Sequence, residues 1–134
     1  GYTKYYCNWI YEDALSQTTL KNINQWRTKL FQLGLIGQYE NGIGFGNISI
    51  RKENTLEFIV SGTQTGHLTT LNEQHYTTVI DYDWDKNHLT CFGPIQASSE
   101  SLTHAAIYES NSEIKGIIHV HHLKLWQKLM DQVP

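Results

Sequence analysis

The sequence predicts an α/β protein in which helices cover a sheet built from hairpins. From Leu20 onward, apolar residues recur three and four positions apart, which is the spacing of one helix face. Two pairs of strand-like segments follow, each pair separated by turn residues. A second helical pattern then leads into the apolar stretch 116–122, which alternates like a strand and carries three histidines. Helices and strands are therefore both expected around one core.

Length and composition are those of a single globular domain. The chain has 134 residues, of which 40% are hydrophobic and 17% charged. We expect one domain over residues 1–134, and we expect it to be part of a longer polypeptide, because the chain starts without Met and stops directly after a helical pattern. The net charge of −3 comes without a basic stripe, so nucleic acid is not an expected partner.

The sequence also bears on membranes and on redox environment. No apolar run approaches the length of a membrane span, so no membrane association is expected. Cys7 and Cys91 form no Cys-x-x-Cys pair and are interpreted as reduced thiols rather than as a disulfide framework. Because no secretory signal pattern is present either, we expect a cytoplasmic protein.

The first residues and the first helix differ in how clearly they are patterned. Residues 2–11 are rich in aromatics but have no clean period, and such rings pack a terminus onto its own domain or a neighbouring subunit. The pattern that follows predicts a helix from Thr19 to Leu33, with either Trp26 or Arg27 on its buried face. Gly34 stands where a helix would end.

A glycine-rich turn opens the first predicted hairpin. Residues 42–51 follow a helix and open a strand, so they match neither a dinucleotide-binding fingerprint nor a P-loop. Asn47 is interpreted as a turn residue within this stretch. The partner strand is Leu56–Val60, and the small hydroxyls and glycines of residues 61–66 either present donors to an anion or simply form a loop.

The second hairpin is expected to be structural. Thr77–Asp83 and His88–Phe92 alternate on either side of the turn at residues 85–87. After this hairpin, Ser98 or Ser99 is a natural N-cap for the second helix. Glu100 falls in its positive first turn.

The start of the second helix has two interpretations. A capped surface helix accounts for its residues without any function, whereas its free N–H groups and serines also suit an anion. Glu100 and His104 lie four positions apart and therefore on one face. A further short helix is expected at Leu123–Met130.

The strand with the histidines is the strongest chemical signal. Alternation places Ile117, His119 and His121 on one face, with the two imidazoles about 7 Å apart along the strand. Histidine is the commonest ligand for zinc and similar metals, so the pair predicts a metal site if further ligands exist. By itself a His-x-His pair is equally well explained by an ordinary core strand.

Taken in order, the motifs resemble the class II aldolase and adducin family, from about Leu20 to His122. The resemblance is carried by Gly46-Asn47-x-Ser49, then Ser61-Gly62-Thr63, then Ser98-Ser99-Glu100 with His104 four residues on, then His119-Val120-His121. It implies a three-layer α/β/α sandwich around a mostly antiparallel central sheet, and active sites between the subunits of a homotetramer.

The resemblance also implies roles for individual residues. His119 and His121 fall where the family has two of its three zinc-binding histidines, and Glu100 falls on its acid/base residue. The positions that hold the substrate phosphate correspond to Asn47, Ser61, Gly62, Ser98 and Ser99. His104 is expected to pack or hydrogen-bond near the site rather than to bind metal. The third histidine ligand and the family's C-terminal tyrosine are not present in this chain, so we expect an incomplete metal site.

The function implied is that of a metal-dependent lyase of the aldolase type. Zinc or another divalent metal, such as manganese, iron or cobalt, would stabilise the enediolate left when a small phosphorylated sugar is cleaved. Epimerase or dehydratase chemistry on the same fold is the nearest alternative, and a non-catalytic adducin-like binding module is a third. Adducin-type domains lose the metal histidines, which favours an enzyme here. The sequence does not identify the substrate.

Overall fold

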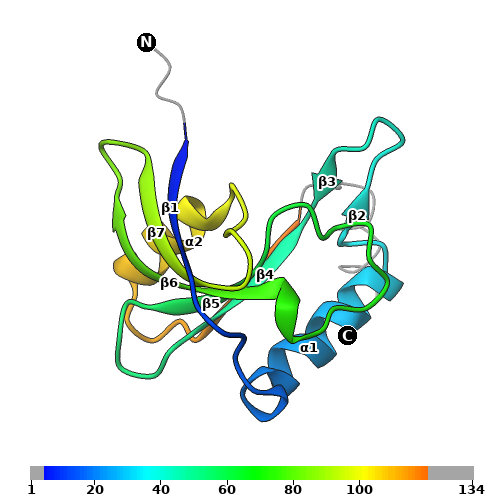
Figure 1. Cartoon of the computed structure of the whole chain (residues 1–134), viewed down its shortest axis with the longest axis horizontal. Helices are drawn as coiled ribbons and strands as arrows, with labels where there is room; N and C mark the ends of the chain where they lie inside the picture. The colour runs from blue at the N-terminus through cyan, green and yellow to red at the C-terminus, as the bar shows by residue number, and fades with distance from the viewer. Residues whose placement is uncertain (1–4, 121–134) are drawn as a thin grey trace, which may run out of the picture.

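The computed structural model describes residues 5–120, which form a six-stranded mixed sheet with the order β1-β7-β6-β5-β4-β8 (Figure 1). Each neighbouring pair is antiparallel except β1 and β7, which run parallel. The strands are β1 (Tyr6–Tyr11), β4 (Asn47–Arg51), β5 (Phe58–Ser61), β6 (Tyr76–Asp83), β7 (His88–Gly93) and β8 (Gly116–His119). The two predicted hairpins are therefore confirmed as β4–β5 and β6–β7.

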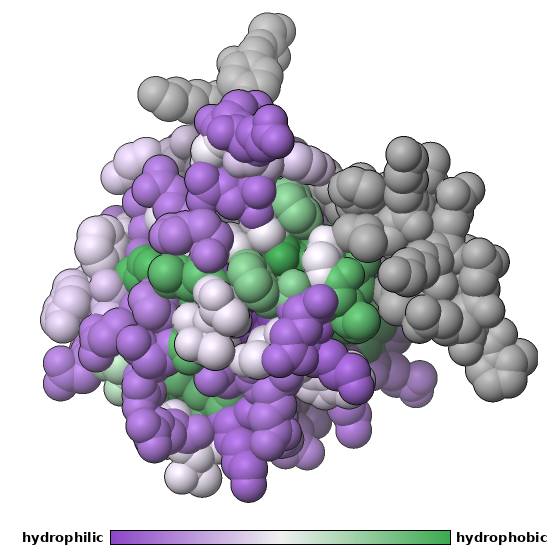
Figure 2. Space-filling view, turned by 90° about the vertical axis from the view of Figure 1, so that its right-hand side faces the viewer, coloured by the Kyte–Doolittle hydropathy of each residue, from purple (hydrophilic) through white to green (hydrophobic). Residues whose placement is uncertain are grey.

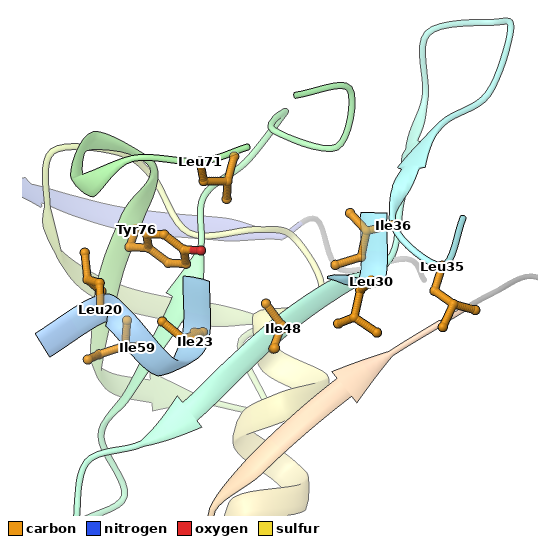
Figure 3. Packing of buried hydrophobic residues seen from close by; sticks show 9 residues of the cluster. All are labelled: Leu20, Ile23, Leu30, Leu35, Ile36, Ile48, Ile59, Leu71 and Tyr76. Atoms are coloured by element: carbon orange, nitrogen blue, oxygen red, sulfur yellow. The ribbon is translucent and has the colours of Figure 1, made fainter. Parts of the chain in front are cut away.

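Helix α1 (Gln17–Gln32) covers one face of the sheet. It begins two residues earlier than predicted, because the Ser16 hydroxyl accepts a hydrogen bond from the Thr19 N–H and caps it. Its apolar stripe packs on the inward side chains of β4, β5 and β6 (Figure 3). This cluster consists of Leu20, Ile23, Leu30, Leu35, Ile36, Ile48, Ile59, Leu71 and Tyr76. The last turn ends at Gly34, whose φ of 76° only glycine adopts readily.

Helix α2 (Ser101–Ser110) covers the opposite face. Side chains alternate along each strand, so Phe58 and Val60 of β5 point away from α1 and pack with α2. This second cluster consists of Phe58, Val60, Val79, Leu89, Cys91, Ala97, Leu102, Ala105 and Tyr108. The two clusters on opposite faces of one sheet confirm the three-layer α/β/α sandwich.

The predicted cap of α2 is wrong. The residue before the helix is Glu100, which has αR backbone angles and makes no side-chain capping hydrogen bond. The chain first makes a turn in which the Ser101 N–H donates to the Ser98 carbonyl. In that turn the Ser98 hydroxyl accepts from the Glu100 N–H, so Ser98 closes the turn instead of capping the helix.

A small hairpin, β2 (Gly37–Gln38) and β3 (Gly44–Phe45), stands apart from the main sheet (Figure 1). Its strand β3 lies within the stretch 42–51 that was predicted as a glycine-rich turn, and its strand β2 lies before that stretch, where no strand was predicted. A 3₁₀ turn, η1 (Glu73–His75), leads into β6. Figure 2 shows the side of the molecule that carries the hairpin: hydrophilic residues predominate, and a band of hydrophobic residues crosses between them.

Strand β1 is an element that the sequence pattern does not predict. It forms one edge of the sheet, and the side chains of Tyr6, Trp9 and Tyr11 are largely exposed. The Trp9 indole N–H donates to the Gly93 carbonyl at 2.9 Å, which fixes the end of β1 to β7. Neither described helix has the combination of length and hydropathy needed to cross a bilayer.

Candidate active site

One cavity of about 760 Å³ collects most of the predicted site residues. It lies between the β2–β3 hairpin, the loop 63–67 that follows β5, and the turn before α2. The predicted residues that line it are Asn47, Ser61, Gly62, Ser98, Ser99 and Glu100. They come from the start of β4, the end of β5 and the turn before α2, so the sheet brings together segments that are far apart in the sequence.

Asn47 and Ser98 connect two of these segments directly. The Asn47 side-chain NH₂ donates to the Ser98 hydroxyl oxygen at 3.2 Å. The same oxygen accepts from the Glu100 N–H at 3.3 Å. With two donors already on its oxygen, the Ser98 hydroxyl keeps its own hydrogen for an acceptor in the cavity. The predicted turn residue Asn47 is instead the first residue of β4, with a side chain only 4% exposed.

Behind Asn47 lies a buried hydrogen-bond network centred on His104. The His104 Nε2 atom contacts the Asn47 Oδ1 atom at 2.5 Å, and Nδ1 lies 2.6 Å from the Ser49 hydroxyl. The Ser49 oxygen is also 2.7 Å from the Tyr108 hydroxyl. Ser49 and His104 are fully buried, and burial lowers the pKa of His104 to about 3, with a smaller contribution from the nearby His119.

The network fixes the tautomer of His104. Because the Asn47 NH₂ donates to Ser98, its carbonyl oxygen faces the ring, and Nε2 must carry the proton. Nδ1 then accepts from Ser49, which in turn accepts from Tyr108. His104 thus holds the Asn47 amide in one orientation, as the prediction of a hydrogen-bonding role implied. The sequence analysis assigned no role to Ser49, although Ser49 belongs to the motif Gly46-Asn47-x-Ser49, and it did not identify Tyr108, since only the packing of β4 against α2 brings them together.

Gly46 and Gly62 let the backbone approach closely at the cavity wall. Gly46 has a φ of +79°, and a Cβ atom there would collide with the Leu35 carbonyl oxygen. A Cβ atom on Gly62 would run into the Ile95 side chain. Gly62 also pairs with Ala97 in an isolated antiparallel bridge. Glycine at these two positions therefore allows the strands and the turn before α2 to close around the cavity.

Arg27 is a buried cation at the cavity wall. The sequence pattern did not decide whether Arg27 or Trp26 lies on the buried face of the helix. Trp26 is 56% exposed, whereas Arg27 is 1% exposed and lines the cavity. Its guanidinium donates to the carbonyls of Thr65 and Leu68 at 2.9 and 2.6 Å. Burial lowers the pKa of Arg27, but an arginine stays charged in proteins. The loop after β5 is therefore held by a positive charge beside the cavity.

His119 lies next to Glu100 at the edge of this region. In the β4–β8 register His119 pairs with Asn47, and its Nδ1 atom lies 3.5 Å from the Glu100 carboxylate. Imidazole nitrogen and carboxylate oxygen both ligate zinc, so the pair fits part of a metal site. Among residues 5–120, no group of three histidine, cysteine or acidic side chains is placed to hold a metal. The other predicted ligand, His121, lies outside the described residues, as does the helix expected at Leu123–Met130.

The remaining histidines have other surroundings. His67 lines the cavity, on the loop after β5. His75 accepts a hydrogen bond from the Asn72 N–H and belongs to the capping box of η1. His88 contacts the Tyr6 ring at the far edge of the sheet, with the ring centroids 5.1 Å apart. Of these three, only His67 lies at the cavity.

The chain matches a known family. The family model described as Class II Aldolase and Adducin N-terminal domain matches residues 33–126, which is most of the chain. The chain therefore belongs to the class II aldolase and adducin family. The match includes each of the predicted site residues.

A solved structure shares the fold. The chain described as L-fuculose 1-phosphate aldolase matches with a TM-score of 0.57 at 20% sequence identity. The match covers 82% of this chain and 47% of that chain, so this chain spans about half the length of the relative. Comparison with curated proteins finds no significant match.

Proposed function

We propose that this chain is the N-terminal and central part of a metal-dependent lyase of the aldolase type, acting on a small phosphorylated sugar. The observation that carries the proposal is the convergence of Asn47, Ser61, Gly62, Ser98, Ser99 and Glu100 on one cavity. The family and the name of the structural relative support the same class of chemistry.

The cavity suits a phosphate group. The Asn47 amide has a second hydrogen beyond the one given to Ser98, and the Ser98 hydroxyl has a hydrogen to donate. Arg27 adds a positive charge at the wall. Because a phosphate presents several strong acceptor oxygens, donors on three separate segments would hold it in one orientation. The sugar carbons would then extend past Glu100.

Glu100 is the proposed acid/base residue. Its carboxylate lies at the cavity wall and beside His119, so it is within reach of both a bound substrate and a metal held by His119 and His121. A divalent metal there would polarise the substrate oxygens and offset the negative charge that develops when the carbon–carbon bond breaks. Glu100 would move the proton at the carbon that carries this charge.

Metal analysis of the longest natural form of the polypeptide tests the proposal. About one zinc or similar ion per chain is expected, and both His119→Ala and His121→Ala should lose it. His88→Ala serves as the matched control, since His88 is exposed on β7, which lies four strands away from β8 in the sheet. Phosphorylated ketoses would then be screened for cleavage, epimerisation and dehydration. The homotetramer that the family resemblance implies would be checked by light scattering on the same preparation.

Failure to bind any divalent metal, even when supplied in excess, would refute the lyase proposal. The domain would then be studied as an adducin-like binding module. If only products of epimerisation or dehydration were found, the proposed metal site and cavity would stand. The aldolase reaction would then be replaced by the alternative chemistry of the same fold.

A further inference from the structure

The two cysteines meet across the parallel pair β1–β7. Cys7 lies on β1 and Cys91 on β7, and their Sγ atoms are 3.4 Å apart, although 84 positions separate them in the sequence. Both are free thiols. Their proximity was not predicted from the sequence. A disulfide bond has an S–S distance of about 2.05 Å, so closing this gap needs a shift of roughly 1.4 Å.

The two thiols differ in access. Cys91 is completely buried in the cluster beneath α2, whereas Cys7 is only partly buried. Cys7 also lies on an edge strand, which has a neighbour on one side alone within the described sheet. An external reagent therefore reaches Cys7 first, and Cys91 is positioned behind it.

The surroundings of Cys7 favour its thiolate. Hydrogen bonding from the Cys91 thiol lowers the pKa of Cys7 to about 6, against the opposing effect of burial, and the Ala97 backbone and the side chains of Tyr5 and Gln96 add to the lowering. Tyr5 and Cys91 are the titratable groups around it, and the pKa of each is raised, so both stay protonated when Cys7 ionises. Cys7 thus combines the reactive form with partial access.

We propose that Cys7 and Cys91 form a reactive dithiol that a small disulfide compound converts into an intramolecular disulfide bond. The Cys7 thiolate attacks one sulfur of the compound, forms a mixed disulfide and releases the other half as a thiolate. Cys91 then loses its proton and attacks the Cys7 sulfur, which breaks the mixed disulfide and releases the second half. The protein loses two protons and two electrons, and the compound takes them up and is reduced to two thiols. Excess dithiol reagent reverses the reaction.

The disulfide bond would link β1 covalently to β7, close to the cavity. Tyr5, two residues before Cys7, donates its hydroxyl to the Ser98 carbonyl at 3.4 Å. Ala97, which contacts the Cys7 sulfur, directly precedes Ser98. Neither thiol is among the residues that line the cavity, so the reaction can be measured whether or not the lyase proposal holds.

The test is oxidation of the folded chain by glutathione disulfide at low protein concentration, followed by intact mass measurement and peptide mapping. The wild-type chain should lose the mass of a pair of hydrogen atoms, with Cys7 linked to Cys91. Cys91→Ser should instead accumulate a glutathione adduct on Cys7, because the resolving thiol is gone. Cys7→Ser should leave Cys91 unmodified in the folded state and modified in guanidinium, where burial is lost.

A second measurement separates thiol reactivity from folding defects. The rate of Cys7 alkylation by iodoacetamide should be half-maximal near pH 6 in the wild type, and the midpoint should rise in Cys91→Ala, where the hydrogen bond from the second thiol is missing. Circular dichroism establishes that each variant is folded. A wild-type chain that stops at the glutathione adduct, or that stays reduced while the unfolded chain reacts, would overturn the proposal. Equal reactivity of Cys91 in the folded Cys7→Ser variant would do the same.

Discussion

The Ser49 hydroxyl and the Nδ1 atom of His104 lie 2.6 Å apart in the fully buried layer between the sheet and α2. The contact matches the tautomer that the Asn47 amide requires, in which Nε2 of His104 carries the proton and Nδ1 accepts from Ser49. The Nε2 proton in turn faces the Asn47 carbonyl oxygen. A hydroxyl without any exposure to the cavity therefore supports, through His104, a donor that we assign to phosphate binding.

Ser49→Ala should destabilise the protein by about 1–3 kcal/mol, because it leaves Nδ1 of His104 and the Tyr108 hydroxyl without this partner in a buried setting. Urea unfolding measures the free energy of unfolding. Ser112→Ala, at an exposed position in the loop before β8, is the control and should change it by less than about 0.5 kcal/mol. Equal effects of the two substitutions would contradict the role of Ser49.

His104 should make stability depend on pH. Its pKa falls from 6.5 to about 3 on folding, so between these values the unfolded chain binds a proton that the folded chain does not. The free energy of unfolding should be highest above pH 6.5 and should fall as the pH drops, by about 1.4 kcal/mol per pH unit from this residue. The difference between wild type and His104→Gln isolates this contribution from that of the carboxylates. If the free energy of unfolding changed equally with pH in the two proteins from about pH 6 to about pH 4, the contribution of His104 would be disproved.

Gly46→Ala and Gly42→Ala form a matched pair. Both glycines have positive φ, at +79° and +87°, so backbone strain in each alanine variant should lower the free energy of unfolding by about 1–2 kcal/mol. Only at Gly46 would the new Cβ atom also meet a backbone oxygen, that of Leu35; at Gly42 the nearest atom is a flexible Gln38 side chain at 3.6 Å. Thermal unfolding should therefore show a clearly larger loss for Gly46→Ala. Similar losses would mean that the backbone there moves aside freely.

Arg27→Lys should loosen the loop after β5. Lysine keeps the positive charge but replaces the planar guanidinium that reaches the carbonyls of Thr65 and Leu68 together. Amide hydrogen exchange of residues 65–69 should accelerate, while exchange in β6 and β7 stays unchanged. Lys29→Arg, the reverse exchange on the exposed side of α1, should leave this loop as it is. Unaltered exchange in Arg27→Lys would show that the charge alone is sufficient.

Glu100→Gln should separate binding from chemistry in the proposed lyase. The amide has nearly the same shape but cannot take up a proton, so kcat should fall by about 10²–10⁴-fold with little change in KM. Glu109→Gln, an exposed carboxylate at the other end of α2, should keep full activity. If kcat survives in Glu100→Gln, another group is the acid/base residue.

The regular elements could be predicted because each has its own local pattern. The helical period of α1, the alternation of β6 and β7 and that of β8 depend only on which side chains face the core. Strand β1 has no such pattern, because five of its six residues are exposed and its apolar side chains do not alternate. Its place in the sheet comes from pairing with β7, which no local window contains.

The sequence predicted which residues belong to the candidate site but not how these residues interact. Resemblance of short motifs selected Asn47, Ser98 and Glu100, and the structure places them at one cavity, although their roles stay predictions. Neither the buried network around His104 nor the contact between the two cysteines follows from sequence spacing. The network depends on how β4 packs against α2, and the cysteine contact depends on how β1 pairs with β7; both are properties of the complete fold.

The parallel pairing of β1 with β7 also sets a sequence of events during protein synthesis. A ribosome that adds about 5–20 residues per second makes Trp9 many seconds before its partner Gly93, 84 positions later, leaves the exit tunnel. During that interval the aromatic side chains of the nascent β1 have no sheet to join. Of the described strands, the one made first therefore waits for a partner that is made 84 positions later, and it is the segment in which a chaperone would find exposed aromatic residues on a ribosome-bound chain.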